Sequence, residues 1–199
     1  MANFTAAFGY DFYIVPLAST SVDTSFAGVT GGVGAGAGNF IDTTTTVATG
    51  ATVSYAAGVF TVDAGAFAMD GTDDPVRLGS LTAASLETDT NAEDIYTYDN
   101  EVKGFNQAVA TTKGFSISLS GVADFKDAGY QILRLTEQNT VADGLRVKFA
   151  RVGPTGTTET VYGYGTLMGY SESNEVASIV SWECSIGGYG PYVLEIDAN

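Results

Sequence analysis

The chain has 199 residues, enough for one domain with a substantial core, and it carries 23 acidic residues against 8 basic ones. Its formal net charge of -15 at pH 7 argues against nucleic-acid binding through a basic patch. Histidine is absent and Cys184 is the single cysteine, which excludes Ser-His and Cys-His nucleophiles, histidine-based metal sites and an intramolecular disulfide.

Residues 1–17 form an aromatic N-terminal segment, in which Phe4, Phe8 and Tyr10 precede an apolar run. The segment has neither the basic start nor the continuous apolar stretch of a secretory signal, and no apolar run in the chain is long enough for a membrane anchor. The pattern predicts an extended arm or a first strand. Docking on a neighbouring molecule and docking on its own core both remain open.

Residues 19–75 are rich in glycine and threonine and are predicted to form a hairpin-like insert. The run VTGGVGAGAGNF lacks the lysine and serine of a phosphate-binding loop, so we interpret residues 28–38 as a flexible loop. Asp70, Asp73 and Asp74 could ligate calcium, but their order does not match an EF-hand loop. An acidic turn is the preferred interpretation.

Residues 87–112 are predicted to form a long acidic loop with aromatic residues spaced along it. Glu93 and Asp94 lie among Tyr96, Tyr98 and Phe105, and this aromatic content argues against disorder. A projecting hairpin that packs on another subunit would explain both features. A pair of glycosidase carboxylates is the enzymatic alternative, but no second acidic motif or aromatic sugar platform supports it.

Residues 114–121 have the clearest strand pattern, with Phe115 on the apolar face. A helix is predicted next, capped by Asp124 or Asp127 and ending near Asn139. A hairpin follows, in which Phe149 points inward. The outward-facing cations of this hairpin are Arg146, Lys148 and Arg151. Two interpretations are open: pairing with acidic residues of a neighbour, or protection of a solvated strand edge.

Residues 161–186 carry the densest alternation of apolar and polar side chains, interrupted by a polar turn at residues 171–175. Val161 and Leu167 share one face, with Tyr162 and Tyr164 on the other. Trp182 lies on the apolar face of the second strand and is predicted to anchor the core together with Phe115 and Phe149. Cys184 lies on the same face, which predicts a buried, inert thiol.

The order of these parts resembles the major tail (tail tube) proteins of long-tailed bacteriophages over residues 76–192. The resemblance is carried by the small-residue step into an acidic loop (GSLTAASLETDTNAEDIYTYDNEVKG), the strand GFSISLSG followed by an Asp-capped helix, and the closing strand VASIVSWECSIGGYG. It implies an antiparallel β-sandwich or barrel with one flanking helix, a long projecting loop and an N-terminal arm.

The resemblance also implies a single-domain virion protein that forms stacked hexameric rings, with an acidic lumen through which duplex DNA passes without specific binding. The implied partners are further copies of the chain, a tape-measure protein inside the tube, and tail-terminator and tip proteins at its ends. The protein would reside in host cytoplasm before assembly and in the virion tail afterwards, with no enzymatic activity, cofactor or metal.

The residues expected at contacts between subunits come from the N-terminal segment, the acidic loop and the cationic strand: Phe4, Phe8, Tyr10, Glu93, Asp94, Tyr96, Tyr98, Phe105, Arg146 and Lys148. Two other classes of protein stay open. One is an extracellular adhesin or carbohydrate-binding β-sandwich with calcium at Asp70, Asp73 and Asp74. The other is an enzyme that uses carboxylates alone.

Overall fold

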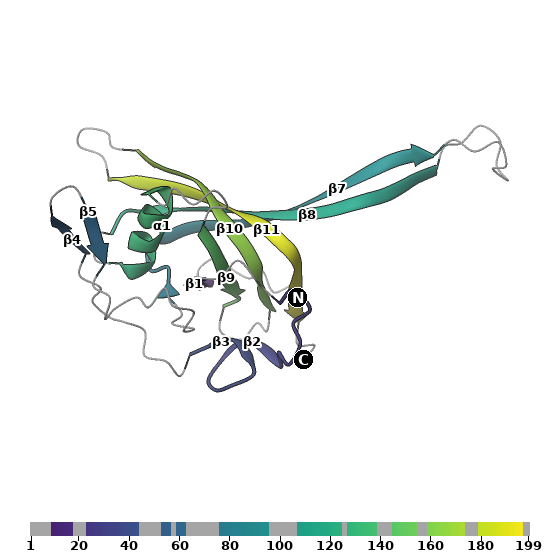
Figure 1. Ribbon diagram of the computed structural model, residues 1–199, viewed down its shortest axis with the longest axis horizontal. Helices are drawn as coiled ribbons and strands as arrows, with labels where there is room; N and C mark the ends of the chain where they lie inside the picture. The colour runs from purple at the N-terminus through teal and green to yellow at the C-terminus, as the bar shows by residue number, and fades with distance from the viewer. Residues whose placement is uncertain are drawn as a thin grey trace, which may run out of the picture.

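A computed structural model describes residues 9–17, 23–43, 53–56, 59–62, 76–95, 107–124, 127–138, 145–154, 159–173 and 179–196. A curved seven-stranded antiparallel sheet dominates it, with the strand order β6-β1-β9-β10-β11-β8-β7 (Figure 1). The elements of this sheet and its one flanking helix are β1 (Asp11–Pro16), β6 (Val76–Arg77), β7 (Leu81–Ile95), β8 (Gln107–Val122), α1 (Ala128–Gln138), β9 (Leu145–Val152), β10 (Glu159–Ser173) and β11 (Ser181–Ile196). The mainly-β antiparallel fold with one helix and a long projection agrees with the prediction.

The main core lies between the helix and one face of the sheet. Alternate residues of β8, β9 and β11 point into it, as their period of two indicates, and Phe149 and Ile186 are fully buried. Trp182 is 1% exposed, and its indole Nε1 donates a hydrogen bond to the carbonyl of Val122 at 3.1 Å. The strand β10 continues to Ser173, so part of the predicted turn at residues 171–175 is extended chain.

Asp127, and not Asp124, caps the helix. Its Oδ1 accepts a hydrogen bond from the backbone N–H of Gly129 at 3.0 Å, two residues into the helix. Its Oδ2 accepts another from the N–H of Gly79 at 2.9 Å and is 3.3 Å from both donors of Ser80. One carboxylate therefore starts α1 and joins it to the turn between β6 and β7.

Replacing Asp127 with alanine is expected to lower the free energy of unfolding by about 1–2 kcal/mol, because a cap and a long-range tie are lost together. Denaturant unfolding followed by circular dichroism measures this. Asp89→Ala, on an exposed strand position, is the control and should match the parent chain. An unchanged midpoint for Asp127→Ala would contradict the capping role.

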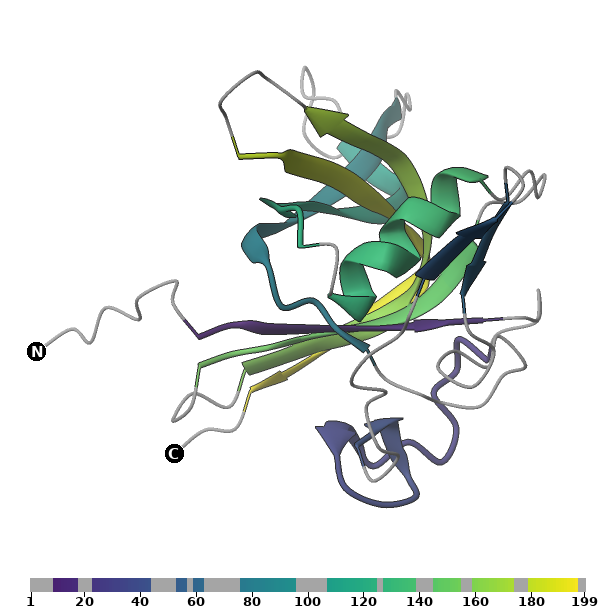
Figure 2. The ribbon, with the colours of Figure 1, turned by 90° about the vertical axis from the view of Figure 1, so that its left-hand side faces the viewer.

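Residues 23–43, which we call the flap, cover part of the opposite face of the sheet (Figure 2). The flap contains a parallel pair of short strands, β2 (Gly31–Gly34) and β3 (Asn39–Asp42). Its Phe40 packs against the rings of Tyr162 and Tyr164, with centroids 5.0 Å away in both cases. The tyrosine face of β10 is therefore a second buried cluster, so β10 is buried on both faces rather than on one.

The glycine-rich run is packed, which corrects the interpretation of residues 28–38 as a flexible loop. A Cβ on Gly32 would lie 2.7 Å from the Tyr162 ring and 2.7 Å from the Thr160 methyl, so only glycine allows the flap to approach this closely. Glu195 secures the contact by accepting a hydrogen bond from the Gly32 N–H at 3.1 Å and another from the Tyr162 hydroxyl at 3.0 Å.

Two further strands within the predicted 19–75 insert form an antiparallel pair, β4 (Val53–Ala56) and β5 (Val59–Val62). The possible calcium ligands Asp70, Asp73 and Asp74 lie outside the described residues. The single described helix, α1, has 11 residues, and no helix in the described ranges is both long enough and apolar enough to cross a membrane.

Candidate assembly surfaces

The strands β7 and β8 run together well beyond the body of the sheet as a projecting hairpin (Figure 1). Residues 87–95 and 107–112 belong to these strands, so most of the stretch predicted as a long loop is the projecting hairpin that was considered for it. The acidic residues, alanines and asparagine of this stretch have low strand propensity, so the sequence signal was weak. Pairing with β8 holds the stretch extended: it runs from Leu86 opposite Ile117 to Ile95 opposite Gln107, with one register shift between Asn91 and Ala92.

The outer part of the hairpin lacks a supporting layer among the described residues. Leu86 and Phe115 still pack on the main core, but the side chains of residues 87–93 and 109–114 are exposed, including Val109 at 45%. A two-stranded ribbon with both faces in water is marginally stable at best, whereas a third strand or a covering layer stabilises it. This geometry favours a partner on the hairpin.

Besides the short edge strand β6, the described sheet has open edges at β7 and along part of β11. The strand β7 is last in the strand order and has β8 as its single neighbour. The strand β11 pairs with β8 only over residues 181–187, so residues 188–196 have β10 alone beside them. Pro191 in this stretch has no N–H to donate, which suits an edge, and Leu194 and Ile196 are 48% and 68% exposed. Open edges of this kind are templates for pairing with another chain.

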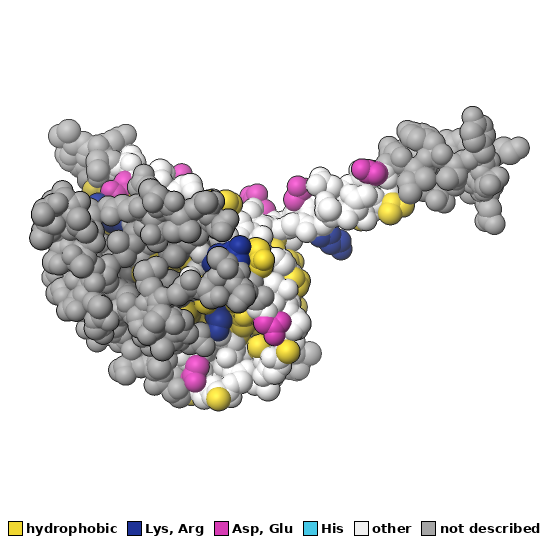
Figure 3. All heavy atoms as spheres, viewed as in Figure 1, with side chains coloured by type: hydrophobic (Ala, Val, Ile, Leu, Met, Phe, Trp, Pro, Cys, Tyr) yellow, Lys and Arg dark blue, Asp and Glu magenta, His cyan; other side chains and the backbone are white. Residues whose placement is uncertain are grey.

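Acidic side chains gather on one side of the hairpin (Figure 3). Glu87 and Asp89 follow Leu86 by one and three residues along the strand. Because Leu86 packs on the core, these two acidic side chains lie on the face turned away from it. On that same sheet face, beside the base of the hairpin, Glu183 of β11 borders a hollow of about 370 Å³ whose lining includes four serines. The exposed face of β7, β8 and β11 is consequently polar and negatively charged.

Three of the predicted contact residues have partners inside the chain. The guanidinium of Arg151 lies 5.3 Å from the centre of the Tyr10 ring, Arg146 lies 4.5 Å from that of Tyr189, and the Lys148 amine lies 5.3 Å from that of Phe40. Glu93 is exposed on the hairpin. The roles of Tyr10, Arg146 and Lys148 between subunits remain predictions.

The remaining predicted contact residues lie outside the described part of the chain. These are Phe4, Phe8, Tyr96, Tyr98, Phe105 and the side chain of Asp94. Their roles between subunits remain predictions.

The described residues contain no group of three metal-ligating side chains. Cys184 is buried, and burial raises the pKa of its thiol to about 11, so the thiol stays protonated at neutral pH. Its Sγ lies 3.5 Å from the carbonyl oxygen of Met168. The thiol therefore has the environment of a packing residue and not of a nucleophile.

Glu172, near the end of β10, connects that strand to the helix. It accepts hydrogen bonds from the hydroxyls of Tyr130, at 2.6 Å, and Tyr170, and it forms an ion pair with Arg134 at 2.8 Å. Burial by itself would raise the pKa of the Glu172 carboxyl, but the two phenol hydrogen bonds and Arg134 outweigh it and lower that pKa. Burial, followed by the hydrogen bond that each hydroxyl donates to Glu172, raises the pKa of Tyr130 and of Tyr170, and Arg134 only partly opposes the rise at Tyr130.

Because the pKa of Glu172 is lower in the folded chain than in the unfolded chain, its contribution to stability is present near neutral pH and is lost as pH falls through the folded value. Glu172→Gln is expected to lower the free energy of unfolding at pH 7 by about 1–2 kcal/mol and to lose less stability than the parent chain on acidification. Urea unfolding at a series of pH values tests this. Parallel pH profiles for the two proteins would contradict it, and Glu183→Gln is the exposed control.

No protein-family model matches the sequence, and no curated protein matches it. Among solved structures, a chain in the sixfold-symmetrised baseplate of the anti-feeding prophage has a TM-score of 0.52 and 5% identity, covering 98% of this chain and 97% of that one. The two chains share a fold. At this identity the likeness is one of fold alone.

Two tail structures are similar over a smaller part of the chain. A chain in the tail of an empty gene transfer agent particle, solved with C6 symmetry, has a TM-score of 0.49 and 16% identity over 63% of this chain and 87% of that one. A chain of the SPP1 tail tube has a TM-score of 0.49 and 14% identity over 64% of this chain and 72% of that one.

Proposed function

We propose that this chain is a virion structural protein that self-assembles into stacked rings, six copies to a ring, to form a tail tube. The observation that carries the proposal is the projecting hairpin, whose outer part is extended but unsupported by the described part of its own chain. A neighbouring copy would supply the missing layer. The shared fold with a chain of a sixfold-symmetrised prophage baseplate supports the same class of assembly.

The open edges of β7 and β11 suit a ring in particular. A closed ring of more than two copies needs heterologous contacts, in which one surface of each copy meets a different surface of the next. The β7 edge and the 188–196 edge of β11 belong to different strands and differ in side chains, so they can serve as two such surfaces. Ring closure would also cover Leu194 and Ile196, which a free subunit exposes.

The tube would serve as the conduit through which DNA is ejected into the host. The net charge of -15 and the acidic, serine-rich face of β7, β8 and β11 support a wall that repels phosphate, so that duplex DNA slides without being bound. A tape-measure protein would occupy the tube before ejection, with terminator and tip proteins at its ends. The subunit would wait in host cytoplasm before it joins the virion tail, and we assign it no catalytic activity.

Negative-stain electron microscopy of the purified chain over a range of concentrations tests the proposal. Stacked rings or hollow tubes with a pore of about 20 Å or more, wide enough for duplex DNA, are expected. A chain that stays monomeric at every concentration, also in the presence of tail-tip extract, would overturn it. No described feature favours the calcium-dependent binding module, since its proposed aspartates lie outside the described residues.

A further inference from the structure

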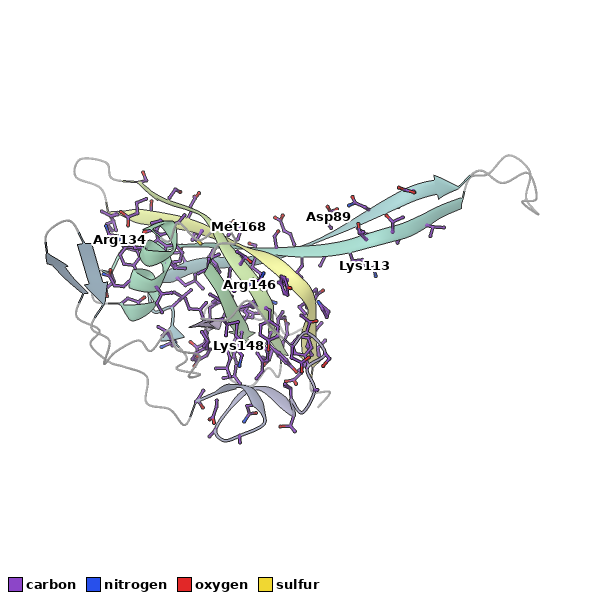
Figure 4. All side chains as sticks on the ribbon, in the orientation of Figure 1. Asp89, Lys113, Arg134, Arg146, Lys148 and Met168 are labelled. Carbon is purple, nitrogen blue, oxygen red and sulfur yellow. The ribbon has the colours of Figure 1, made fainter. Side chains whose placement is uncertain are left out.

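Lys113 is a cation on the projecting hairpin of a strongly acidic protein. It lies on β8 opposite Thr90 and is exposed. Two residues before Phe115, it shares the sheet face that continues from the main core, whereas Asp89 is on the opposite face. Figure 4 shows the two side chains on opposite sides of the hairpin, so the charges of the hairpin are sorted between its faces.

The other cations of the described residues are already engaged within the chain. Three form ion pairs: Arg77 with Asp11, Arg134 with Glu172 and Arg151 with Glu159. Two lie over aromatic rings: Arg146 over Tyr189 and Lys148 over Phe40. Among the described residues, Lys113 contacts no carboxylate and no ring.

We propose, on the basis of the proposed tube, that Lys113 pairs with a carboxylate of a second copy that packs under the hairpin. Two subunits of charge -15 repel each other, and at physiological salt this repulsion is screened beyond about 8 Å, so the charges at the contact itself decide its sign. A lysine on the covered face changes the contact from acid against acid to cation against acid.

The face around Lys113 fits a protein partner. Its neighbours on that face, Thr88 and Thr90, are small, so another subunit can approach the backbone of the hairpin closely. A phosphate-binding role fits less well, because a single lysine between the acidic residues Glu87, Asp89 and Glu93 does not form the basic patch that DNA requires. The occupant is therefore a second copy of this chain.

The first test is zero-length carbodiimide cross-linking of assembled full-length protein, prepared from a mixture of isotope-labelled and unlabelled copies. A peptide that joins Lys113 to a carboxylate of the other isotope is expected in the mass spectrum. Cross-links of Lys113 that never join two copies would overturn the inference.

The second test is the critical concentration for assembly of three variants, measured by sedimentation at about 50 mM and about 500 mM NaCl. Lys113→Gln is expected to raise it about 3–5-fold at low salt, Lys113→Glu about tenfold, and Lys113→Arg less than about twofold, with smaller differences at high salt. Each variant should melt like the parent chain, because the side chain is exposed.

Assembly of the parent chain tests the proposed tube, and assembly of the Lys113 variants tests the Lys113 contact. A parent chain that never assembles overturns the proposed tube, and the Lys113 contact with it. A parent chain that assembles while Lys113→Glu has the same critical concentration at both salts overturns the Lys113 contact alone. Binding of duplex DNA that is lost in Lys113→Gln, without any cross-link between copies, would assign the lysine to DNA instead.

Discussion

Replacing residues 93–109 with a two-residue Asn-Gly turn is expected to leave a folded monomer that forms no tubes. The turn would join Ala92 to Ala110, which face each other across the hairpin and so accept a tight connection. The described side chains from Glu87 outward lie beyond the buried core, so the midpoint of unfolding should stay close to that of the parent chain. Assembly should fail because the neighbour loses the strand pair that it covers.

Sedimentation and negative-stain microscopy measure this outcome across concentration. A full-length hairpin with Glu87→Gln and Asp89→Asn is the matched control, since it removes acidic charge outside the predicted contact set and keeps the length. That control should still assemble. Normal tubes from the shortened chain would refute the role of the hairpin between subunits.

Trp182→Ala is expected to lower the free energy of unfolding by about 3–5 kcal/mol, the cost of truncating a large aromatic side chain in a tight core. The indole is 1% exposed, and a Cβ on Gly121 would lie 2.4 Å from its ring, so the backbone of Gly121 packs directly against the indole. The ring centroid of Tyr130 lies 6.4 Å away, which ties the helix to the same site. The loss of its hydrogen bond to Val122 adds to the cavity.

Urea unfolding followed by far-ultraviolet circular dichroism measures this change, since the variant no longer has a tryptophan for fluorescence. Trp182→Phe should cost less than the alanine variant because it refills most of the volume, although it loses the N–H donor. A parent-like midpoint for Trp182→Ala would show that the residue is peripheral to the stability of the core.

The core strands could be predicted because their signal is local. Phe115, Ile117 and Leu119 alternate with serines, and this period alone assigns them to one face of a strand. The helix was equally readable from its apolar spacing. Its cap was not, because Asp124 and Asp127 are chemically equivalent. Asp127 is distinguished by Gly79, which lies 48 residues away in sequence.

The candidate assembly surface could be predicted only in outline. A projecting hairpin was expected within residues 87–112, but its strands could not be placed, because their extended form comes from pairing between β7 and β8 and not from propensity. Arg146 and Lys148 were selected as outward-facing cations on β9, but the packed flap places Phe40 beside Lys148, and Tyr189 lies beside Arg146. No local sequence pattern marked Lys113 as a contact residue, because its exposure depends on how far the hairpin extends beyond the rest of the sheet.

Composition and local periodicity are enough to exclude histidine chemistry and an intramolecular disulfide, to give the net charge of -15 and to assign side chains to strand faces. These conclusions follow from composition and from the alternation of a single strand, which need no other segment. Which of these faces are covered depends on tertiary packing: the flap buries Tyr162, while Lys113 is exposed. Burial depends on contacts between segments far apart in the chain, and no local period encodes those contacts.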